Sequence, residues 1–329
     1  MPTIMLVRRI GGAALLLWLV VTLTFVLIRV APGDPAAFLI PPGASEADAA
    51  RVRAELGLDR SMFVQYARWL LAMLSGDLGT SFASGRAVSS LLAEAAPISL
   101  LLGGVSLALT FVIGVPVGML QASQRGRPTD RVLTILTTAI YAAPSFWLAL
   151  ALVAVFTYGA ASMGLPAGWR LPAFGIRTPG VALEGWAGMV DVIRHSILPV
   201  AILAAVGAAG IARYARTSVA DVLRLDFVRT ARAKGLRTRT VYARHVLANV
   251  LPPLVVLFAL SLPGLLAGSI FVESVFAWPG LGRATLTAIL ARDYPVVMGA
   301  TVFYAAAVIV ANLAAELALP LLDPRREAA

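Results

Sequence analysis

Cysteine is absent from this chain of 329 residues, and histidine and lysine nearly so. Disulfides, thiolate nucleophiles and thiolate-bound metals are therefore excluded. Only two histidines are present, His195 and His245, and the topology derived below puts them on opposite sides of a membrane, so they cannot share a metal ion. The single lysine, Lys234, precedes Gly235, which excludes the phosphate-binding pattern G-x-x-x-x-G-K-[ST]. If the protein's work needs ATP, another chain must bind and hydrolyse it.

Charged residues are also scarce, at 13% of the chain with 59% hydrophobic residues, against roughly 25% charged in a soluble domain. A helix needs about 20 apolar residues to cross the hydrocarbon core of a bilayer. We therefore predict an all-α polytopic membrane protein with six transmembrane helices. The six apolar runs are Ile10–Val30, Pro97–Leu120, Val132–Tyr158, Ile197–Ile211, Leu251–Phe271 and Val296–Leu319.

Prolines and run lengths refine this prediction. The fourth run is short, so we expect it to continue as helix through 212–225, or to begin earlier at His195 and Ser196. Kinks are expected at Pro116, Pro144 and Pro263. The first apolar run is longer than the core of a signal peptide, about 7–15 residues, and no small-x-small cleavage site follows it, which favours an uncleaved anchor.

The charge distribution predicts the orientation. With both termini in the cytoplasm, the inner segments are 1–9, 122–131, 213–250 and 320–329. These segments carry 16 Arg and Lys residues and five acids, while the outer sequence carries 11 of each. This is the positive-inside pattern. The high pI is then explained by topology, and nucleic-acid binding is not expected.

The sequence divides into four parts: the N-terminus and first span (1–30), a long external region (31–95), a five-span core (96–322) and a short cytoplasmic tail (323–329). In the external region, Ser45 and Asp48 resemble a capping box that opens a helix ending at Gly57. An aromatic and apolar stripe then follows near helical spacing, which suits either a helix at the membrane interface or one packed on the spans. Its residues are Phe63, Tyr66, Trp69, Leu70 and Met73. Two further outer loops are expected at 159–194 and 273–295, the latter with a compact turn at Trp278–Gly282.

The basic loop, residues 213–250, is the most informative part of the core. Asp226 is expected to be an N-cap, Phe227–Lys234 two helical turns, and Gly235 the left-handed residue that ends them. A second helix, Val241–Val250, is expected to begin with Thr238 or Thr240 as its cap and to stop at Pro252 and Pro253.

We expect Phe227 and Ala231 to share one face, with the small Ala231 allowing a partner surface to approach. A rim of cations surrounds this face: Arg229, Arg232, Lys234, Arg237 and Arg239. Contact with anionic lipid would explain the charge, but not the helix–glycine–helix pattern.

The basic loop resembles the coupling motif of permease subunits of binding-protein-dependent ABC importers. The general motif reads E-A-A-x-x-x-G, and only Ala231, Gly235 and Leu247 match it. Residues Arg229–Leu236 (R-T-A-R-A-K-G-L) and Arg244–Asn249 (R-H-V-L-A-N) instead match the version of the dipeptide/oligopeptide/nickel branch. Further strings are similar to the B-type permease of that branch along nearly the whole chain. They are Arg29–Pro35, Gly57–Arg60, Val64–Tyr66, Gly76–Ser81, Asp130–Arg131, Pro144–Trp147, Glu273–Arg283, Ala291–Val297 and Leu322–Arg325.

The resemblance implies a type I ABC importer permease fold in the bacterial inner membrane, without catalytic activity or bound cofactor. A homologous C-type permease would complete the translocation path, two ATPase subunits would bind ATP and Mg²⁺, and an extracytoplasmic solute-binding protein would deliver the substrate. The loop would couple ATPase closure to span rotation. Residues implied in this coupling are Asp226, Phe227, Arg229, Thr230, Ala231, Arg232, Ala233, Lys234, Gly235, Leu236 and His245.

Gate or pathway candidates are Glu273, Trp278, Asn312 and Glu316. Glu316 lies near the inner end of the sixth span, where it can either serve the path or pair with an inner-face arginine such as Arg9 or Arg213. Glu273 either holds the Trp278 turn or meets a cationic substrate group. Hydroxyl and amide groups inside spans usually bond to their own helix, so Ser106, Thr110, Ser145, Ser261 and Asn312 are individually weak ligand candidates. His195 is expected to cap the outer end of the fourth span, and His245 to pack within the loop.

Two other function classes are disfavoured. A secondary transporter would be expected to show mid-membrane charges and inverted repeats, and a membrane enzyme a cluster of catalytic groups; neither is present in the sequence. The cargo is left open: peptides are the first expectation, with nickel complexes, glutathione and oligosaccharides as alternatives.

Overall fold

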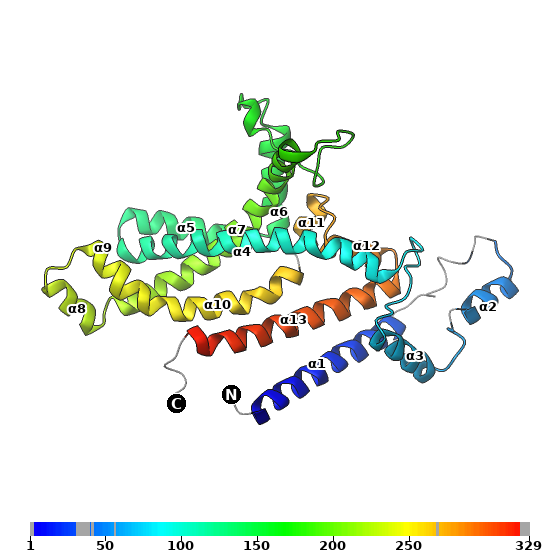
Figure 1. Cartoon of the computed structure of the whole chain (residues 1–329). Helices are drawn as coiled ribbons and strands as arrows, with labels where there is room; N and C mark the ends of the chain where they lie inside the picture. The colour runs from blue at the N-terminus through cyan, green and yellow to red at the C-terminus, as the bar shows by residue number, and fades with distance from the viewer. Residues whose placement is uncertain (1–2, 31–39, 41–42, 56, 268–269, 323–329) are drawn as a thin grey trace. The chain divides into compact units, whose positions relative to one another are not determined.

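The computed structural model describes residues 3–30, 40, 43–55, 57–267 and 270–322. Over this part of the chain the secondary structure is helical, with one isolated bridge between Thr80 and Ala87 (Figure 1). The all-α prediction is confirmed. The chain forms two compact units: unit 1 comprises Met1–Ile98 and Gly280–Ile309, and unit 2 comprises Ser99–Pro279 and Val310–Ala329.

Five described helices are long and apolar enough to cross a membrane, and a sixth crossing is possible through a bent pair. The pair is α5 (Pro128–Ala142) with α6 (Ser145–Val153) and its π-helical extension η1 (Ala154–Tyr158), bent by 103°. The third run is therefore broken, where a single span was expected. The cause lies at Pro144: the preceding Ala143 is extended, with ψ 140°, as sterics before proline favour.

In unit 1, the external region folds against the first span. Helix α2 (Glu46–Glu55) begins where the Asp48 amide donates to Ser45 Oγ (3.2 Å), and Gly57 has φ 65°, as the capping pattern predicted. The rings of Tyr66 and Trp69 on α3 (Met62–Leu74) pack on Phe25 of α1 (Thr3–Val30), at 5.3 and 5.7 Å between centroids. The stripe was expected either to lie at the membrane interface or to pack on the spans, and Tyr66 and Trp69 pack on a span.

A second apolar cluster in unit 1 joins the start of α4 (Val88–Ser123) to α12 (Leu281–Leu290) and α13 (Tyr294–Leu322). Helix α12 occupies much of the expected outer loop 273–295, because Gly280 ends the turn and an apolar face follows that buries Leu281. Beside it, Asp293 is buried and accepts hydrogen bonds from Ser81 Oγ (2.5 Å) and from the amide of Phe82 (3.0 Å). This carboxylate holds the turn 81–84 on the start of α13.

In unit 2, α4 and α7 (Gly185–Val222) are in backbone contact. A Cβ added at Gly114 would lie 2.8 Å from the carbonyl oxygen of Ala208, and one added at Gly118 would lie 2.4 Å from that of Ala212. One added at Gly207 would lie 2.4 Å from Thr110 Oγ1. Small residues therefore allow a close crossing, as is common between membrane helices.

The contacts of α4 and α7 also fix their relative direction. Successive contacts pair positions 110 with 207, 114 with 208 and 211, and 118 with 212 and 215, so both numbers rise together and the helices run parallel. If both span a membrane, the α5–α6 segment between them must make one net crossing, which supports treating the bent pair as a span. Helix α7 extends past the fourth run at both ends, where the sequence predicted one extension or the other, and includes Pro199 in its interior.

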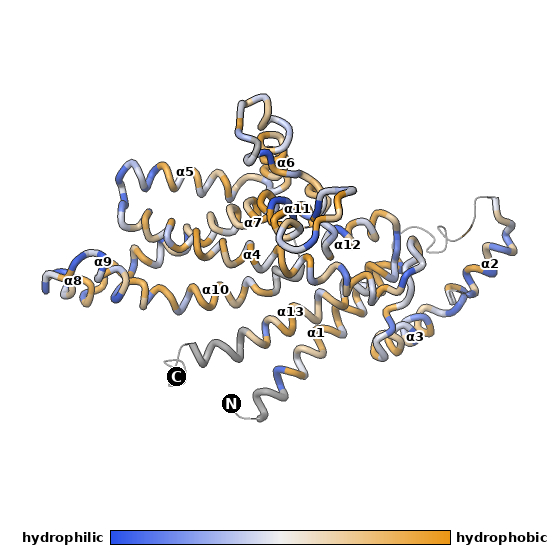
Figure 2. The backbone as a smooth tube through the Cα atoms, turned by 45° about the horizontal axis from the view of Figure 1, so that its top comes forward, coloured by the Kyte–Doolittle hydropathy of each residue, from blue (hydrophilic) through white to orange (hydrophobic). Residues whose placement is uncertain are grey.

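The basic loop contains α8 (Asp226–Ala233), α9 (Thr238–Thr240) and the π-helical η3 (Val241–Val246), and runs into α10 (Leu247–Ala267). The expected stop at Pro252 and Pro253 is wrong, since both lie inside α10. Proline is tolerated inside a membrane helix when the backbone groups that it leaves without a partner find other hydrogen bonds nearby, for example in a π-helical turn. Such a turn, η3, directly precedes α10. Figure 2 shows the polar α8–α9 segment at one end of the apolar α10.

Candidate functional site

Helix α8 is anchored by its inner face. Val228 and Ala231 are buried in a cluster with Val219 of α7, Val241 and Val246 of η3, and Val250 and Leu254 of α10. Gly235 ends the helix in the left-handed region at φ 77°, as predicted, and its amide donates to the carbonyl of Arg232 (2.9 Å). A displacement of α8 must therefore be passed to α7 and α10, because close-packed interiors transmit strain.

The outer side of α8 and of the residues that flank it, over 225–239, is exposed and mixed in character. Apolar side chains at Leu225, Phe227 and Leu236 are 47%, 40% and 40% exposed. Polar and basic residues surround them, all exposed: Asp226, Arg229, Thr230, Arg232, Lys234, Arg237 and Arg239. Exposed apolar anchors with a polar rim are the composition of a protein docking surface.

Two local expectations for α8 are wrong. The N-cap is Leu225, and Asp226 is the first helical residue, whose carboxylate lies 3.4 Å from Arg229 Nη1. Ala231 does not share an outward face with Phe227; it is 5% exposed and packs inside the chain. The small side chain at 231 thus permits the helix to approach η3 and α10, while Ala233 faces outward with the rim.

The end of unit 2 that carries α8 is also stabilised by an ion pair between α5 and α7. Asp130 is buried and accepts two hydrogen bonds from Arg216, from Nε (3.0 Å) and Nη2 (2.9 Å), and a third from the Gly126 amide (3.0 Å). A bidentate arginine–carboxylate pair fixes geometry as well as charge. Asp130 therefore ties the turn before α5 to the helix that carries α8.

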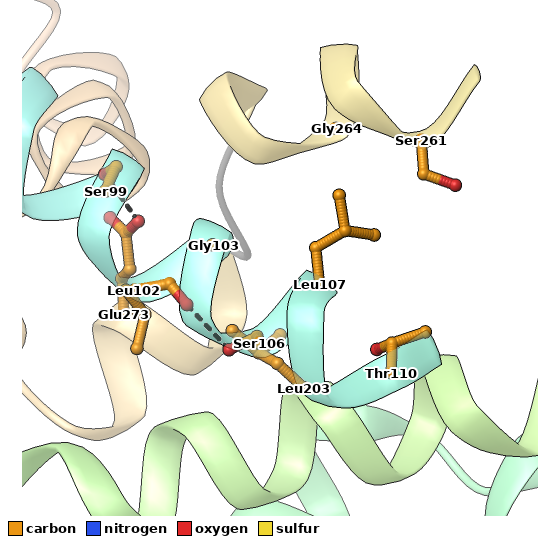
Figure 3. Close-up of a pocket in the computed structure, with 10 residues that line it drawn as sticks. All are labelled: Ser99, Leu102, Gly103, Ser106, Leu107, Thr110, Leu203, Ser261, Gly264 and Glu273. Carbon is orange, nitrogen blue, oxygen red and sulfur yellow. Dashed lines mark hydrogen bonds between the residues drawn. The ribbon is translucent and has the colours of Figure 1, made fainter. Parts of the chain in front are cut away.

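A pocket of about 200 Å³ lies at the other end of unit 2, between α4, α7, α10 and α11 (Ile270–Val275). Figure 3 shows Glu273 of α11 beside Ser99 of α4, whose hydroxyl donates to Glu273 Oε1 (2.7 Å). Glu273 is fully buried, and Ser99, Ser106 and Thr110 are buried with it. The sequence singled out Glu273, Ser106, Thr110 and Ser261 separately but missed Ser99 and the pocket that collects them.

The remaining site candidates are dispersed. Trp278 is buried, and its amide donates to the carbonyl of Glu273 (2.8 Å), so the two residues are joined through the backbone turn. Asn312 of α13 is exposed. The side chain of Glu316 lies outside the described residues, and its role stays a prediction. Arg213, a suggested partner for Glu316, lies over the ring of Tyr141 at 5.0 Å.

The histidines lie apart in the fold. His195 lies well inside α7 and is not a cap; it is buried, with Nδ1 2.8 Å from the carbonyl of Asp191 one turn earlier. His245 lies in η3, half-buried, and its carbonyl accepts from Asn249 (2.7 Å). Within the described part of the chain, no group of three or more His, Asp or Glu residues could hold a metal ion.

Two family models match the chain. The model described as "Binding-protein-dependent transport system inner membrane component" matches residues 114–328, and the corresponding N-terminal model matches residues 3–103. The chain belongs to this family. With several apolar helices long enough to cross a bilayer, it is a multi-pass membrane transport permease.

Curated relatives match the permease over almost its whole length. The oligopeptide transport system permease protein AppB of Bacillus subtilis is 38% identical over 306 residues, which is 93% of each chain. The probable D,D-dipeptide transport system permease protein DdpB of Escherichia coli is 36% identical over 327 residues, covering 97% of this chain and 96% of that one.

Solved structures support the fold of the permease. A chain of the MetNI methionine ABC transporter, in an inward-facing conformation, aligns with a TM-score of 0.52 at 19% identity, over 71% of this chain and 97% of that chain. The expected type I ABC importer permease fold is thereby confirmed.

Proposed function

We propose that this permease forms half of the translocation path of an ATP-driven peptide importer in the bacterial inner membrane. A homologous C-type permease forms the other half, two ATPase subunits dock on the cytoplasmic face, and a solute-binding protein delivers the substrate from outside. ATP and Mg²⁺ belong to the ATPase subunits, so this chain binds no cofactor and catalyses no reaction. Both termini lie in the cytoplasm.

The observation that carries the coupling role is the two-sidedness of α8. Its inner face is fixed in the cluster that contains α7, η3 and α10, whereas Phe227 on its outer face and Leu236 just after it are exposed within a basic rim. A helix seated in a partner's groove through such anchors is an established mode of recognition. ATPase closure would push α8, and the shared cluster would move the attached spans as a rigid body.

Peptides are the proposed cargo because AppB and DdpB, which match nearly the full chain, are named oligopeptide and D,D-dipeptide permeases. Nickel complexes, glutathione and oligosaccharides remain alternatives for the same machinery. A secondary transporter, which would work without ATPase subunits, is the alternative of another class.

The docking role is tested with Phe227→Glu and Leu236→Glu in the complete transporter. We expect substrate-stimulated ATP hydrolysis to fall at least tenfold, since a carboxylate placed in an apolar groove without a partner costs on the order of 1–3 kcal/mol or more. The matched control is Thr129→Glu, which adds a carboxylate at an exposed position of another expected cytoplasmic segment, away from α8. Normal stimulation in the first two variants would contradict the docking role.

The cargo is tested by uptake of labelled di- and tripeptides, Ni²⁺ chelates, glutathione and oligosaccharides by cells that depend on this transporter. Peptide uptake that disappears when the ATPase subunits are inactivated is the expected result. Uptake that persists without ATPase activity and follows an ion gradient would support the secondary transporter instead.

A further inference from the structure

Unit 1 contains a pocket of its own, between α1, α3, the turn at 77–82 and the start of α13. Its volume of about 350 Å³ lies in the range of pockets that hold small ligands, about 300–1,000 Å³. Most of the lining is apolar or aromatic, but two side chains of opposite charge belong to it, Arg29 of α1 and Asp77 of the turn. A ligand in this pocket therefore meets a cation, an anion and apolar walls.

Both charges are available to a ligand. The half-buried guanidinium of Arg29 lies over the ring of Phe25, 5.4 Å from its centroid, and no carboxylate among the described residues forms an ion pair with it. A cation–π contact uses the flat face of the guanidinium and leaves the N–H donors at its edge for an anion. Asp77 is exposed and accepts one hydrogen bond, from the Gly79 amide (2.8 Å). A carboxylate has room for further donors.

The pocket lies where a span ends. Arg29 is in the last turn of α1, at the end of an apolar window that covers Arg8–Val30. Arginine near the end of a membrane helix extends its charged group to the interface, and Trp and Tyr are enriched at the level of the lipid headgroups. Trp69 and Tyr294 both line the pocket. The charged pair is thus placed at headgroup level.

Helix α3 presents an apolar face to the surroundings beside this pocket. Trp69 and Ala72 line the pocket from one side of the helix. On the opposite side, at helical spacing, Phe63, Leu71 and Leu74 are exposed. An apolar stripe of this kind is typical of a helix that lies in the interface of a bilayer. Lipid molecules are therefore the expected neighbours of the pocket.

We propose that this pocket binds the headgroup of a phospholipid that carries a primary ammonium group, phosphatidylethanolamine. Arg29 holds the phosphate, which arginine binds through two parallel hydrogen bonds, and Asp77 accepts from the ammonium group. The acyl chains lie along the apolar surface of α1. A choline headgroup has no N–H donor for Asp77, and a glycerol headgroup has no cation for it. The site is separate from the coupling and cargo roles proposed above.

The test uses the absence of cysteine from this chain. Thr80→Cys, at an exposed position of the pocket lining, is introduced into the complete transporter in nanodiscs of phosphatidylcholine, alone or mixed with phosphatidylethanolamine or phosphatidylglycerol. We expect the ethanolamine lipid to slow modification by a neutral maleimide about tenfold, the effect of one hydrogen bond between charged groups. Phosphatidylglycerol should not slow it. Ala83→Cys, exposed and outside the lining, should react equally in all three nanodiscs.

The protection must depend on both charges. Asp77→Asn keeps the acceptor for the Gly79 amide but should abolish the difference between ethanolamine and choline lipids. Arg29→Gln should abolish protection, and Arg29→Lys, which keeps the charge without the fork of donors, should retain part of it. Matched controls are Asp59→Asn and Arg68→Gln, both exposed and outside the lining, which should leave protection unchanged. Equal labelling in all nanodiscs, or full protection in Asp77→Asn, would overturn the proposal.

Three further outcomes would assign the pocket to another ligand and refute the inference. Equal protection by phosphatidylglycerol would show that the ammonium group is not recognised. Protection by millimolar inorganic phosphate in pure phosphatidylcholine would indicate a site for a free anion. Protection that requires the solute-binding protein, in any lipid, would indicate a protein contact. None of these measurements requires transport, so a failure of the proposed importer function would leave the lipid site standing.

Discussion

The two ends of unit 2 are built in opposite ways. At the α8 end Val228 and Ala231 pack in an apolar cluster against η3 and α10, the buried Asp130 is paired with Arg216, and the charges of α8 itself face outward. At the α11 end the carboxylate of Glu273 and several hydroxyl groups are buried beside a pocket. A close-packed end can pass on a push from another protein without deforming, whereas the buried polar groups at the other end must be satisfied by hydrogen bonds.

The same two helices reach both ends. Helix α4 carries Ser99 and Ser106 at the pocket and Ala122 in the α8 cluster, while α7 carries Leu203 at the pocket and Val219 in that cluster. Their parallel contact at Gly114 and Gly118 lies between the two ends. We infer that force applied at α8 moves two walls of the pocket together.

The largest effect is expected from a charge placed inside the apolar cluster that anchors α8. Ala231→Arg puts a guanidinium into the apolar cluster, where an unpaired buried charge costs several kcal/mol, so we expect loss of uptake and a markedly lower melting temperature of the purified complex. Ala233→Arg, on the exposed side of the same helix, should change stability little. Equal behaviour of the two variants would refute the assignment of an inner and an outer face.

We expect Gly235→Pro to abolish uptake while the protein still inserts into the membrane. Proline fixes φ near −65° and has no amide proton, whereas Gly235 has φ 77° and donates to the carbonyl of Arg232. Gly235→Ala keeps the amide and should cost only about 1–2 kcal/mol for the left-handed conformation, with partial activity. Uptake assays with quantified membrane insertion give the comparison; full activity of Gly235→Pro would show that the turn does not transmit force.

The link between the two ends is tested by Gly118→Ala. The added methyl group would lie 2.4 Å from a backbone carbonyl of α7, so the helices must separate, and overpacking of this kind typically costs 1–3 kcal/mol. Gly104→Ala on the same helix meets no atom within 4 Å and serves as the control. We expect only Gly118→Ala to lower the melting temperature and to reduce the amount of substrate imported per ATP hydrolysed.

The sequence predicted features that depend on local chemistry. Gly235 as the left-handed end of α8, Ser45 as a cap and the extension of α7 beyond its apolar run follow from residues close in the chain. The bend at Pro144 was expected as a kink, but its size of 103° depends on the packing of α6 against α7 and α11. The side of α8 that is buried was mispredicted, because Phe227 and Val228 are both apolar and only tertiary contacts decide between them.

The pocket could be recognised only in part from sequence. Spacing could have revealed the row at Ser99, Gly103, Ser106 and Thr110, because these small and polar residues recur on one face of α4. Its position opposite Glu273, 174 residues later, depends on long-range packing of α11. The single-residue argument that a serine in a span bonds to its own helix was right for Ser106 and Ser261, and that bond is what leaves their oxygens as acceptors.

The smallest effect is expected from Arg229→Gln, which distinguishes protein docking from lipid contact at the α8 end. The side chains of Arg229 and Asp226 are 75% and 95% exposed. Exposed pairs of this kind contribute little to stability, so the melting temperature should not change.

If the rim faces an ATPase subunit, the variant should lower the affinity of ATPase binding two- to fivefold, by roughly 0.4–1 kcal/mol, equally in vesicles of neutral and of anionic lipid. If the rim instead rests on lipid, the variant should matter only in anionic vesicles, because attraction of basic residues to the surface requires negative headgroups. ATPase binding measured in both vesicle types separates the two, and dependence on anionic lipid alone would assign the basic rim to the membrane while leaving Phe227 and Leu236 as the docking anchors.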